Sequence, residues 1–336
     1  QRQMCIRDSK FIDMYAGRLR NQVSFMLSAC NFYMPIFEEA LDAYGLPLEL
    51  RYLPIIESAL NPSAVSRAGA SGLWQFMIGT GKIYGLESNS LVDERRDPIK
   101  ATWAAARYLK EMYDIYGDWN LVIAAYNCGP GTINKAIRRA NGETDYWKIY
   151  NYLPKETRGY VPAFIAANYV MTYYCDHNIC PMETNIPAST DTVQVNKNLH
   201  FEQIADLCNV PLDQIKSLNP QYKKQMIPGD SKPYTLRLPI DAISTFIDKQ
   251  DTIYTHRADE LFRNRKTVAV KDITPATRKT TSAVAGKGNL TYYTIKSGDT
   301  LSTIARKYGV TIKDIQRWNG MSSTKIAAGK RLKIYK

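Results

Sequence analysis

Four short groups of residues contain the side chains with which this chain could do chemistry. In chain order they are Glu57-Ser58, Gly72-Leu73-Trp74-Gln75, Ala125-Tyr126-Asn127 and Tyr160-Val161-Pro162. A glutamic acid can deliver a proton to a leaving oxygen, and hydroxyl and amide groups can hold both the acid and a polar substrate. No single group is specific, so their order and combination have to carry any functional interpretation.

Glu57 is the candidate acid, but a glutamate is ordinarily ionised at neutral pH and has no proton to give. It ends the apolar run Leu53-Pro54-Ile55-Ile56, and burial beside apolar groups raises the pKa of a carboxyl group. The alternative is a helix-end carboxylate in a salt bridge, which is the better interpretation of an isolated Glu-Ser pair. The three other groups, in this order, favour catalysis.

Helices are expected to position these groups, because residues 10–180 show helical signals almost throughout. Apolar residues recur at helical spacing over Gln22–Tyr44, where Pro35 is expected to break or kink the helix. Leu48–Glu57 is expected to form a second helix, which is short and buried.

Two aspartates mark further helix starts in the predicted pattern. Asp97-Pro98 places an N-cap before a proline at the first helical position, and Asp118 is expected to cap the next helix, which includes Tyr126 and Asn127. A last helix is expected to follow Pro162. None of the four groups contains a carboxylate other than Glu57. Asp97 and Asp118, which lie outside the groups, are explained as caps.

The C-terminal part contains an internal repeat at an offset of one hundred residues. The aligned pairs are Val195 and Ile295, Ile204 and Ile304, Val210 and Val310, Ile215 and Ile315, and Asn219 and Asn319. Residues 262–289 lie between the two copies, with seven Lys or Arg against Asp272 and no periodicity. This composition predicts a basic, flexible linker.

The formal net charge of +12 favours an anionic partner but does not indicate which kind. A nucleic-acid function is disfavoured, because the basic residues are not interleaved with a recognisable binding motif; a cell-wall polymer or an anionic membrane surface explains the charge equally well. The sequence contains no apolar run of 18 or more residues, so it predicts no transmembrane helix. Cysteine and histidine spacing predicts no metal site, and a disulfide between Cys175 and Cys180 stays open.

Together, the four groups resemble the catalytic domain of the soluble lytic transglycosylase family, lysozyme-like enzymes that cleave the glycan strands of bacterial peptidoglycan. The resemblance covers about residues 20–185. Leu53–Ala59 and Arg95-Arg96-Asp97-Pro98 are similar to a membrane-bound branch of that family.

This resemblance implies a carbon–oxygen lyase with one carboxyl group and no metal or cofactor. Glu57 would protonate the bond between N-acetylmuramic acid and N-acetylglucosamine, and would then take the proton of the muramoyl C6 hydroxyl, whose attack leaves a 1,6-anhydro end. Tyr126 and Tyr160 can also be core aromatics with satisfied hydroxyls. The residues implied to bind substrate are Ser58, Gly72, Leu73, Trp74, Gln75, Tyr126, Asn127 and Tyr160.

The second repeat copy resembles a LysM module, a small unit that binds glycans containing N-acetylglucosamine. The residues implied to bind glycan are Gly298, Asp299, Thr300, Leu301 and Ile326. The first copy has Asn198-Leu199-His200 where the second has Gly298-Asp299-Thr300, so it is a degenerate copy. Whether it binds glycan or acts as a spacer stays open.

These resemblances imply an α+β multidomain chain: a mainly α-helical, lysozyme-like catalytic domain followed by small βααβ LysM modules. Residues 1–9 are interpreted as non-native, because they resemble a translated sequencing adapter. The other expected divisions are 10–185 for catalysis, 190–240 for the degenerate module, 241–289 for an extension and linker, and 290–336 for the LysM module.

The expected partner is peptidoglycan, in the periplasm or cell envelope, and any lipid anchor is expected in a native N-terminus that precedes this sequence. Two other functions stay open. A hydrolytic muramidase would use water and need a second carboxylate. A non-catalytic peptidoglycan-binding protein would have lost some of Glu57, Gln75 and Asn127, all of which are present.

Overall fold

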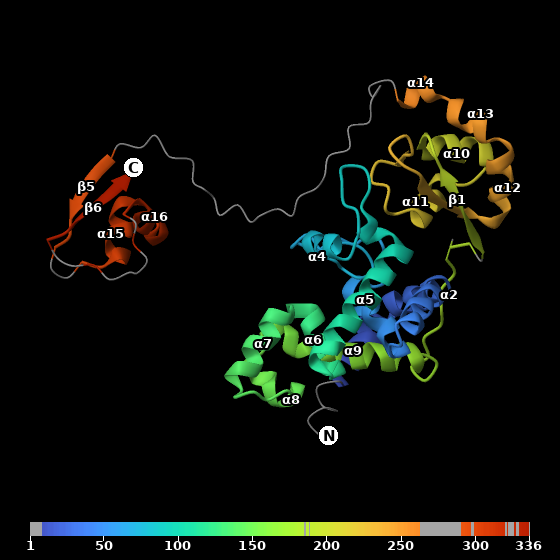
Figure 1. Ribbon diagram of the computed structural model, residues 1–336. Coiled ribbons are helices and arrows are strands. Elements are labelled where there is room, and N and C mark those ends of the chain that lie inside the picture. Colours follow the sequence, from blue (N-terminus) through green and yellow to red (C-terminus); the bar gives the residue numbers. More distant parts are fainter. Residues whose placement is uncertain are drawn as a thin grey trace. The chain divides into compact units, whose positions relative to one another are not determined.

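The computed structural model describes residues 9–184, 186–187, 189–262, 290–296, 299–319, 321, 326 and 329–335. The chain divides into two compact units, one up to Pro275 and one from Ala276 onward (Figure 1). The adapter-like residues 1–8, the expected linker over 263–289 and Gly298 lie outside the described residues. None of the helices in the described ranges has the length and apolar character needed to cross a membrane.

The first part of unit 1 is helical, and one apolar core joins its helices. Within this core α2 packs on α5, α5 on α6, and α6 on α9. The elements are η1 (Met14–Arg18), α2 (Arg20–Ala43), η2 (Leu48–Tyr52), α3 (Leu53–Ser58), α4 (Ile78–Ile83), η3 (Glu94–Arg96), α5 (Pro98–Tyr116), α6 (Trp119–Cys128), α7 (Pro130–Arg139), α8 (Tyr146–Ile149), η4 (Tyr150–Tyr152) and α9 (Lys155–Thr172).

The two predicted aspartate caps are confirmed. The Asp97 carboxylate accepts hydrogen bonds from the backbone N–H groups of Ile99 and Lys100, each at 3.0 Å, at the start of α5. Asp118 accepts one from Leu121 at 2.8 Å at the start of α6. These three bonds satisfy donors that the first helical turn leaves without an intrahelical partner.

Two prolines lie inside helices, where the sequence predicted boundaries. Pro35 does not break α2, which runs unbroken over 24 residues. The expected start after Pro162 is wrong, because α9 begins at Lys155. A proline leaves the carbonyl four residues earlier without a helical donor, and here the Tyr146 hydroxyl donates to the Arg158 carbonyl at 3.1 Å.

The second part of unit 1 has a core of its own, built from two small antiparallel sheets and short helices. Strand β1 pairs with β4, and β2 with β3. Phe246 and Ile253 are buried in this core, so the expected extension after residue 240 packs on the module. The elements are β1 (Thr190–Val195), β2 (Asn198–His200), α10 (Phe201–Cys208), α11 (Leu212–Leu218), β3 (Met226–Pro228), β4 (Tyr234–Pro239), α12 (Ile240–Asp248), α13 (Gln250–Thr255) and α14 (Ala258–Leu261).

Unit 2 repeats the strand–helix–helix–strand order with β5 (Leu290–Thr294), α15 (Leu301–Tyr308), α16 (Ile312–Trp318) and β6 (Arg331–Tyr335). The predicted repeat is confirmed by its two asparagines. Asn219 donates to the carbonyls of Ile215 and Arg237, and Asn319 donates to those of Ile315 and Lys333, at 2.8 to 2.9 Å. The expected α+β class, with a mainly helical domain before small sheet-containing modules, is confirmed.

Candidate active site

Glu57 lies in the last turn of α3 and is partly buried. The chain leaves this helix through Ala59 and Leu60, which both adopt left-handed φ angles, of 52° and 57°. Burial raises the pKa of Glu57 to about 7, against an opposing effect of its hydrogen bond from Tyr160, and the charge of Glu156 raises it further. A carboxyl group with this pKa exchanges its proton near neutral pH, as a general acid and base must.

Two tyrosine hydroxyls surround this carboxyl group. Tyr160, on α9, donates a hydrogen bond to Oε1 of Glu57. Tyr126, on α6, donates to the backbone carbonyl of Trp74 at 2.6 Å. Burial, and then the nearby charge of Glu57, raise the pKa of both tyrosines well above the ordinary value. Both hydroxyls therefore stay neutral and act as donors.

The loop over residues 69–76, here named the site loop, is joined to the residue that follows Glu57 by a hydrogen bond to one of its backbone carbonyls. Ser58 Oγ donates to the carbonyl of Leu73 at 2.9 Å. Gln75 has a left-handed φ of 49°, and its Nε2 donates to the carbonyl of Gly72 at 2.7 Å. The amide of Gln75 therefore holds its own loop, and a substrate contact would have to use its remaining hydrogen-bonding capacity.

Gly72 allows two backbone segments to approach closely. Its φ is +87°, and a Cβ atom there would lie 1.7 Å from the carbonyl oxygen of Arg95. The family resemblance implied that Gly72 binds substrate. In the structure the approach is to η3, so Gly72 fixes the course of the site loop.

Leu73 and Trp74 point into the core, which differs from their expected role as substrate contacts. Their side chains are 1% and 0% exposed. Trp74 Nε1 donates to Thr102 Oγ1 at 2.9 Å, and its ring meets Phe37 edge-on. Bulky apolar side chains such as these are buried because packing in the core removes their surface from water. Substrate contacts of these two residues would have to come from their backbone.

Asn127 lies near the end of α6, and its Oδ1 accepts a hydrogen bond from Thr157 Oγ1 at 2.9 Å. Thr157 and Glu156 belong to the first turn of α9. Neither was singled out from the sequence, because the helix was expected to begin only after Pro162. The signal that could have found them is Pro154 before a Lys-Glu-Thr run, which suits a helix N-terminus.

A cavity of about 1170 Å³ lies beside the turn that follows Glu57, between α2, residues 58–63 and α11. Ser58 lines this cavity, whereas Glu57, Gln75 and the two tyrosines do not. Of the expected site residues of unit 1, Tyr160 bonds to Glu57 itself, whereas Ser58 and Tyr126 bond to the site loop. Within the described ranges, no cluster of three His, Cys, Asp or Glu side chains is placed to hold a metal ion.

The expected glycan-binding residues of unit 2 are partly structural. Leu301 is 2% exposed and belongs to the core, so its side chain does not face a ligand. Thr300 Oγ1 accepts from the backbone N–H of Thr303 at 3.2 Å and caps α15. Asp299 accepts from Tyr293 and from the N–H of Lys296, each at 2.8 Å, and Ile326 packs against the module core. The described cysteines, including Cys175 and Cys180, are unpaired.

Three protein-family models match the chain. The transglycosylase SLT domain matches residues 34–149, the LysM-like domain of lytic transglycosylase MltD matches 189–255, and the LysM domain matches 293–334. These ranges fall within the helical part of unit 1, its second part and unit 2, respectively.

Curated relatives cover the same regions. The chain is 33% identical over 294 residues to membrane-bound lytic murein transglycosylase D of Escherichia coli K12, which is 86% of this chain and 60% of that relative. It is 33% identical over 124 residues to the soluble lytic murein transglycosylase of the same strain, which is 35% of this chain and 19% of that one. The chain thus spans about 60% of the length of the first of these relatives.

Among solved structures, the 70 kDa soluble lytic transglycosylase SLT70 of Escherichia coli matches with a TM-score of 0.37 and 29% identity. The match covers 43% of this chain and 24% of that one.

Proposed function

Because the chain is an MltD-like protein with an SLT domain, an MltD-type LysM-like domain and a LysM domain, we propose that it is a lytic transglycosylase of peptidoglycan. It would cleave the β-1,4 bond between N-acetylmuramic acid and N-acetylglucosamine and leave a 1,6-anhydromuramoyl end. The observation that supports this most is the carboxyl group of Glu57, whose pKa is about 7.

The first half of the reaction needs Glu57 in its protonated form. Tyr160 occupies Oε1, and within the described part of the chain Oε2 has no hydrogen-bond partner, so Oε2 is available to carry the proton. Glu57 gives this proton to the glycosidic oxygen, and the bond from that oxygen to C1 of the muramoyl residue breaks. The N-acetylglucosamine side leaves as an alcohol, and Glu57 becomes a carboxylate.

The second half uses the same group as a base. The carboxylate, stabilised by the hydrogen bond from Tyr160, takes the proton of the muramoyl C6 hydroxyl. The C6 oxygen then bonds to C1, which closes the anhydro ring and restores the protonated Glu57. No water is consumed, because an intramolecular hydroxyl can reach an effective concentration of roughly 10⁵ M or more.

The remaining expected site residues support this chemistry from around Glu57. In this proposal Ser58, Gly72 and Gln75 set the course of the site loop, Tyr126 and Tyr160 hold it and the acid, and Asn127 contacts an N-acetyl group. The LysM module would keep the enzyme on insoluble glycan and raise its local concentration there. In this proposal the protein works in the cell envelope, with outer-membrane anchoring as a further expectation.

One feature favours a second candidate, a hydrolytic muramidase. Glu156 is an exposed carboxylate at the start of α9, and its charge is close enough to Glu57 to raise the pKa of that group. A second carboxylate is what water activation would require. We favour the transglycosylase, because Glu156 is solvated and makes no hydrogen bond to the Tyr160–Glu57 pair within the described residues.

Glu57→Gln tests the proposal directly. The variant keeps an acceptor for Tyr160 but has no transferable proton, so release of soluble muropeptides should fall by at least about 1000-fold, while co-sedimentation with peptidoglycan stays at the parent level. Glu39→Gln, at an exposed position of α2, is the matched control. Near-parent cleavage by Glu57→Gln would overturn the assignment of the acid.

A further inference from the structure

The degenerate repeat copy contacts residues 87–96 of the helical domain, which we name the bridging segment (Figure 1). Its backbone pairs with the loop after α11: the N–H of Lys223 donates to the carbonyl of Leu91 at 2.8 Å, and the N–H of Asp93 donates to that of Gln221 at 2.9 Å. Leu91 and Val92 are 3% and 0% exposed and belong to the core of the module. The segment is thus anchored in the module.

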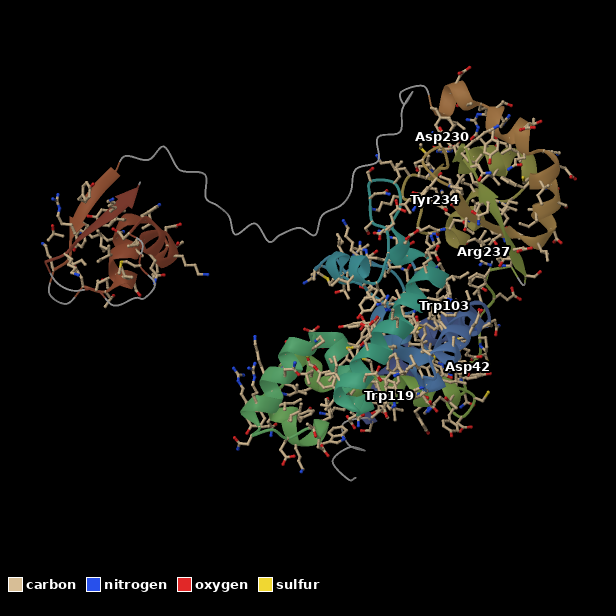
Figure 2. All side chains as sticks on the ribbon, viewed as in Figure 1. Asp42, Trp103, Trp119, Asp230, Tyr234 and Arg237 are labelled. Atoms are coloured by element: carbon tan, nitrogen blue, oxygen red, sulfur yellow. The ribbon has the colours of Figure 1, made fainter. Side chains whose placement is uncertain are left out.

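Side chains of the module reinforce this anchoring. Lys223 Nζ donates to the carbonyl of Asn89 at 2.7 Å and lies 3.9 Å from Oδ2 of Asp93. Glu87 forms an ion pair with Lys232 at 2.6 Å and accepts from the hydroxyl of Tyr234 at 3.1 Å. Figure 2 labels Tyr234 on the side of the module near the bridging segment. The contacts are largely polar and directional, so they fix a position rather than only bury area.

The same segment holds the site loop from its other side. Asp93 and Arg95 form a two-pronged ion pair, with Nε and one terminal nitrogen of Arg95 each 2.8 Å from a carboxylate oxygen. The other terminal nitrogen donates to the carbonyl of Gly69 at 2.8 Å and to that of Phe76 at 2.9 Å. One buried guanidinium group therefore joins the first and last residues of the site loop.

The ion pair is ionised in spite of its burial. Burial pushes the pKa of Asp93 upward, but the bond with Arg95 outweighs it, and the pKa lies below the ordinary value. A buried pair of this kind is sensitive to the loss of either partner or of the groups that complete its hydrogen bonding. Lys223 is such a group, since it adds a third charge at the edge of the pair.

We propose that the degenerate copy is a positioning element of the catalytic domain: Lys223, through Asp93 and Arg95, holds the site loop in the conformation that the Glu57 site requires. The site loop offers the carbonyls that accept from Ser58 and Tyr126, so its displacement reaches the residue that follows Glu57 and the tyrosine whose pKa the charge of Glu57 raises. The kinetic consequence of this inference rests on the proposed function, whereas its structural consequence does not.

The degenerate loop agrees with this role. The polar side chains of Asn198-Leu199-His200 are engaged within the module: Asn198 bonds to Asp230, and His200 accepts from the N–H of Glu202 at 3.3 Å as the cap of α10. Leu199 is 0% exposed. The residues that replace the glycan-binding loop of the other copy thus stabilise the module that grips the bridging segment.

The experiment compares Lys223→Met with Lys224→Met in the full chain. Lys224 is the exposed neighbour, so the two variants lose the same charge and differ in the contacts to Asn89 and Asp93. Hydrogen–deuterium exchange of peptides that cover residues 69–76 should become at least about tenfold faster in Lys223→Met, because fewer bonds hold the loop. Lys224→Met should match the parent, and Lys223→Arg, which keeps a donor, should restore slow exchange.

Kinetics provide the second measurement. With a soluble glycan substrate, kcat of Lys223→Met should fall about tenfold with KM nearly unchanged, because Lys223 contacts no substrate and a small misplacement costs up to roughly 100-fold. Unchanged exchange in Lys223→Met, or equal changes in both variants, would overturn the positioning role. Faster exchange with an unchanged kcat would overturn its catalytic importance. A parent chain without activity would refute the proposed function alone, since the exchange result would still decide the coupling.

Discussion

The hydroxyl of Tyr160 donates a hydrogen bond to Oε1 of Glu57, although the two residues are 103 positions apart. The bond joins α9 to the end of α3. It is one of two opposing effects on the pKa of this carboxyl group. Burial raises the pKa of Glu57, and the bond from Tyr160 lowers it, with about 7 as the result. This balance gives both a usable acid and a usable base near neutral pH.

Tyr160→Phe should raise the pKa of Glu57 above about 7, because burial remains and the donor that stabilises the carboxylate is lost. The alkaline limb of the pH–rate profile, where Glu57 loses its proton, should move to higher pH. The rate at the optimum should fall roughly ten- to hundredfold, since a hydrogen bond to a charged group is worth about 1.5–3 kcal/mol. Tyr169→Phe, at an exposed position of the same helix, is the control. A limb that moves to lower pH would contradict the assignment.

Glu57→Gln should stabilise the fold in alkaline solution. The pKa of Glu57 is about 4.5 when unperturbed and about 7 in the folded chain, so the carboxyl group costs nothing below the first value, where both states are protonated. Its cost grows as pH rises through that window and reaches at most about 3 kcal/mol above it. Denaturant unfolding near pH 4 and pH 8 measures this; an equal effect at both would show that the group is not desolvated.

Glu156→Gln distinguishes the two candidate reactions. If Glu57 acts alone, the variant should keep its turnover within about twofold and form the same product. The alkaline limb should move slightly to lower pH, because the charge of Glu156 raises the pKa of Glu57. A loss of activity of 100-fold or more would instead identify Glu156 as a catalytic base and support hydrolysis.

Gly72→Ala and Gly69→Ala form a matched pair at two nearly equal φ angles, +87° and +88°. Gly69 has open space where a Cβ would lie, so its substitution should cost only the left-handed strain of about 1–2 kcal/mol. At Gly72 the Cβ would meet the Arg95 carbonyl at 1.7 Å, and the cost should exceed about 3 kcal/mol. Thermal unfolding of both variants tests this; similar losses would mean that the close approach is not needed.

The sequence could predict features that depend on local chemistry. Asp97 and Asp118 were recognisable as caps because a short polar side chain before a helix satisfies its first N–H groups. The repeat was visible because apolar residues and an asparagine recur at an offset of one hundred residues. Asn219 and Asn319 make equivalent hydrogen bonds in the two copies. Glu57 was a recognisable candidate because an apolar run precedes it.

Other features depend on contacts that no short pattern reveals. The start of α9 was missed because the helix tolerates Pro162. The carbonyl of Arg158, which the proline leaves without a helical donor, accepts from the hydroxyl of Tyr146 on α8. Trp74 was expected at the substrate, but tertiary packing on Phe37 directs it into the core. The grip of the degenerate module on the bridging segment joins residues about 130 positions apart, such as Lys223 and Asn89, and only the folded chain brings them together.

The most direct test of a reaction driven by Glu57 alone is mass spectrometry of the soluble products formed from peptidoglycan in water enriched in oxygen-18. The proposed mechanism predicts muropeptides that are one water lighter than hydrolysed ones and contain no label, because the C6 hydroxyl closes on C1. Labelled products with hydrated muramoyl ends would contradict it and identify the protein as a hydrolase.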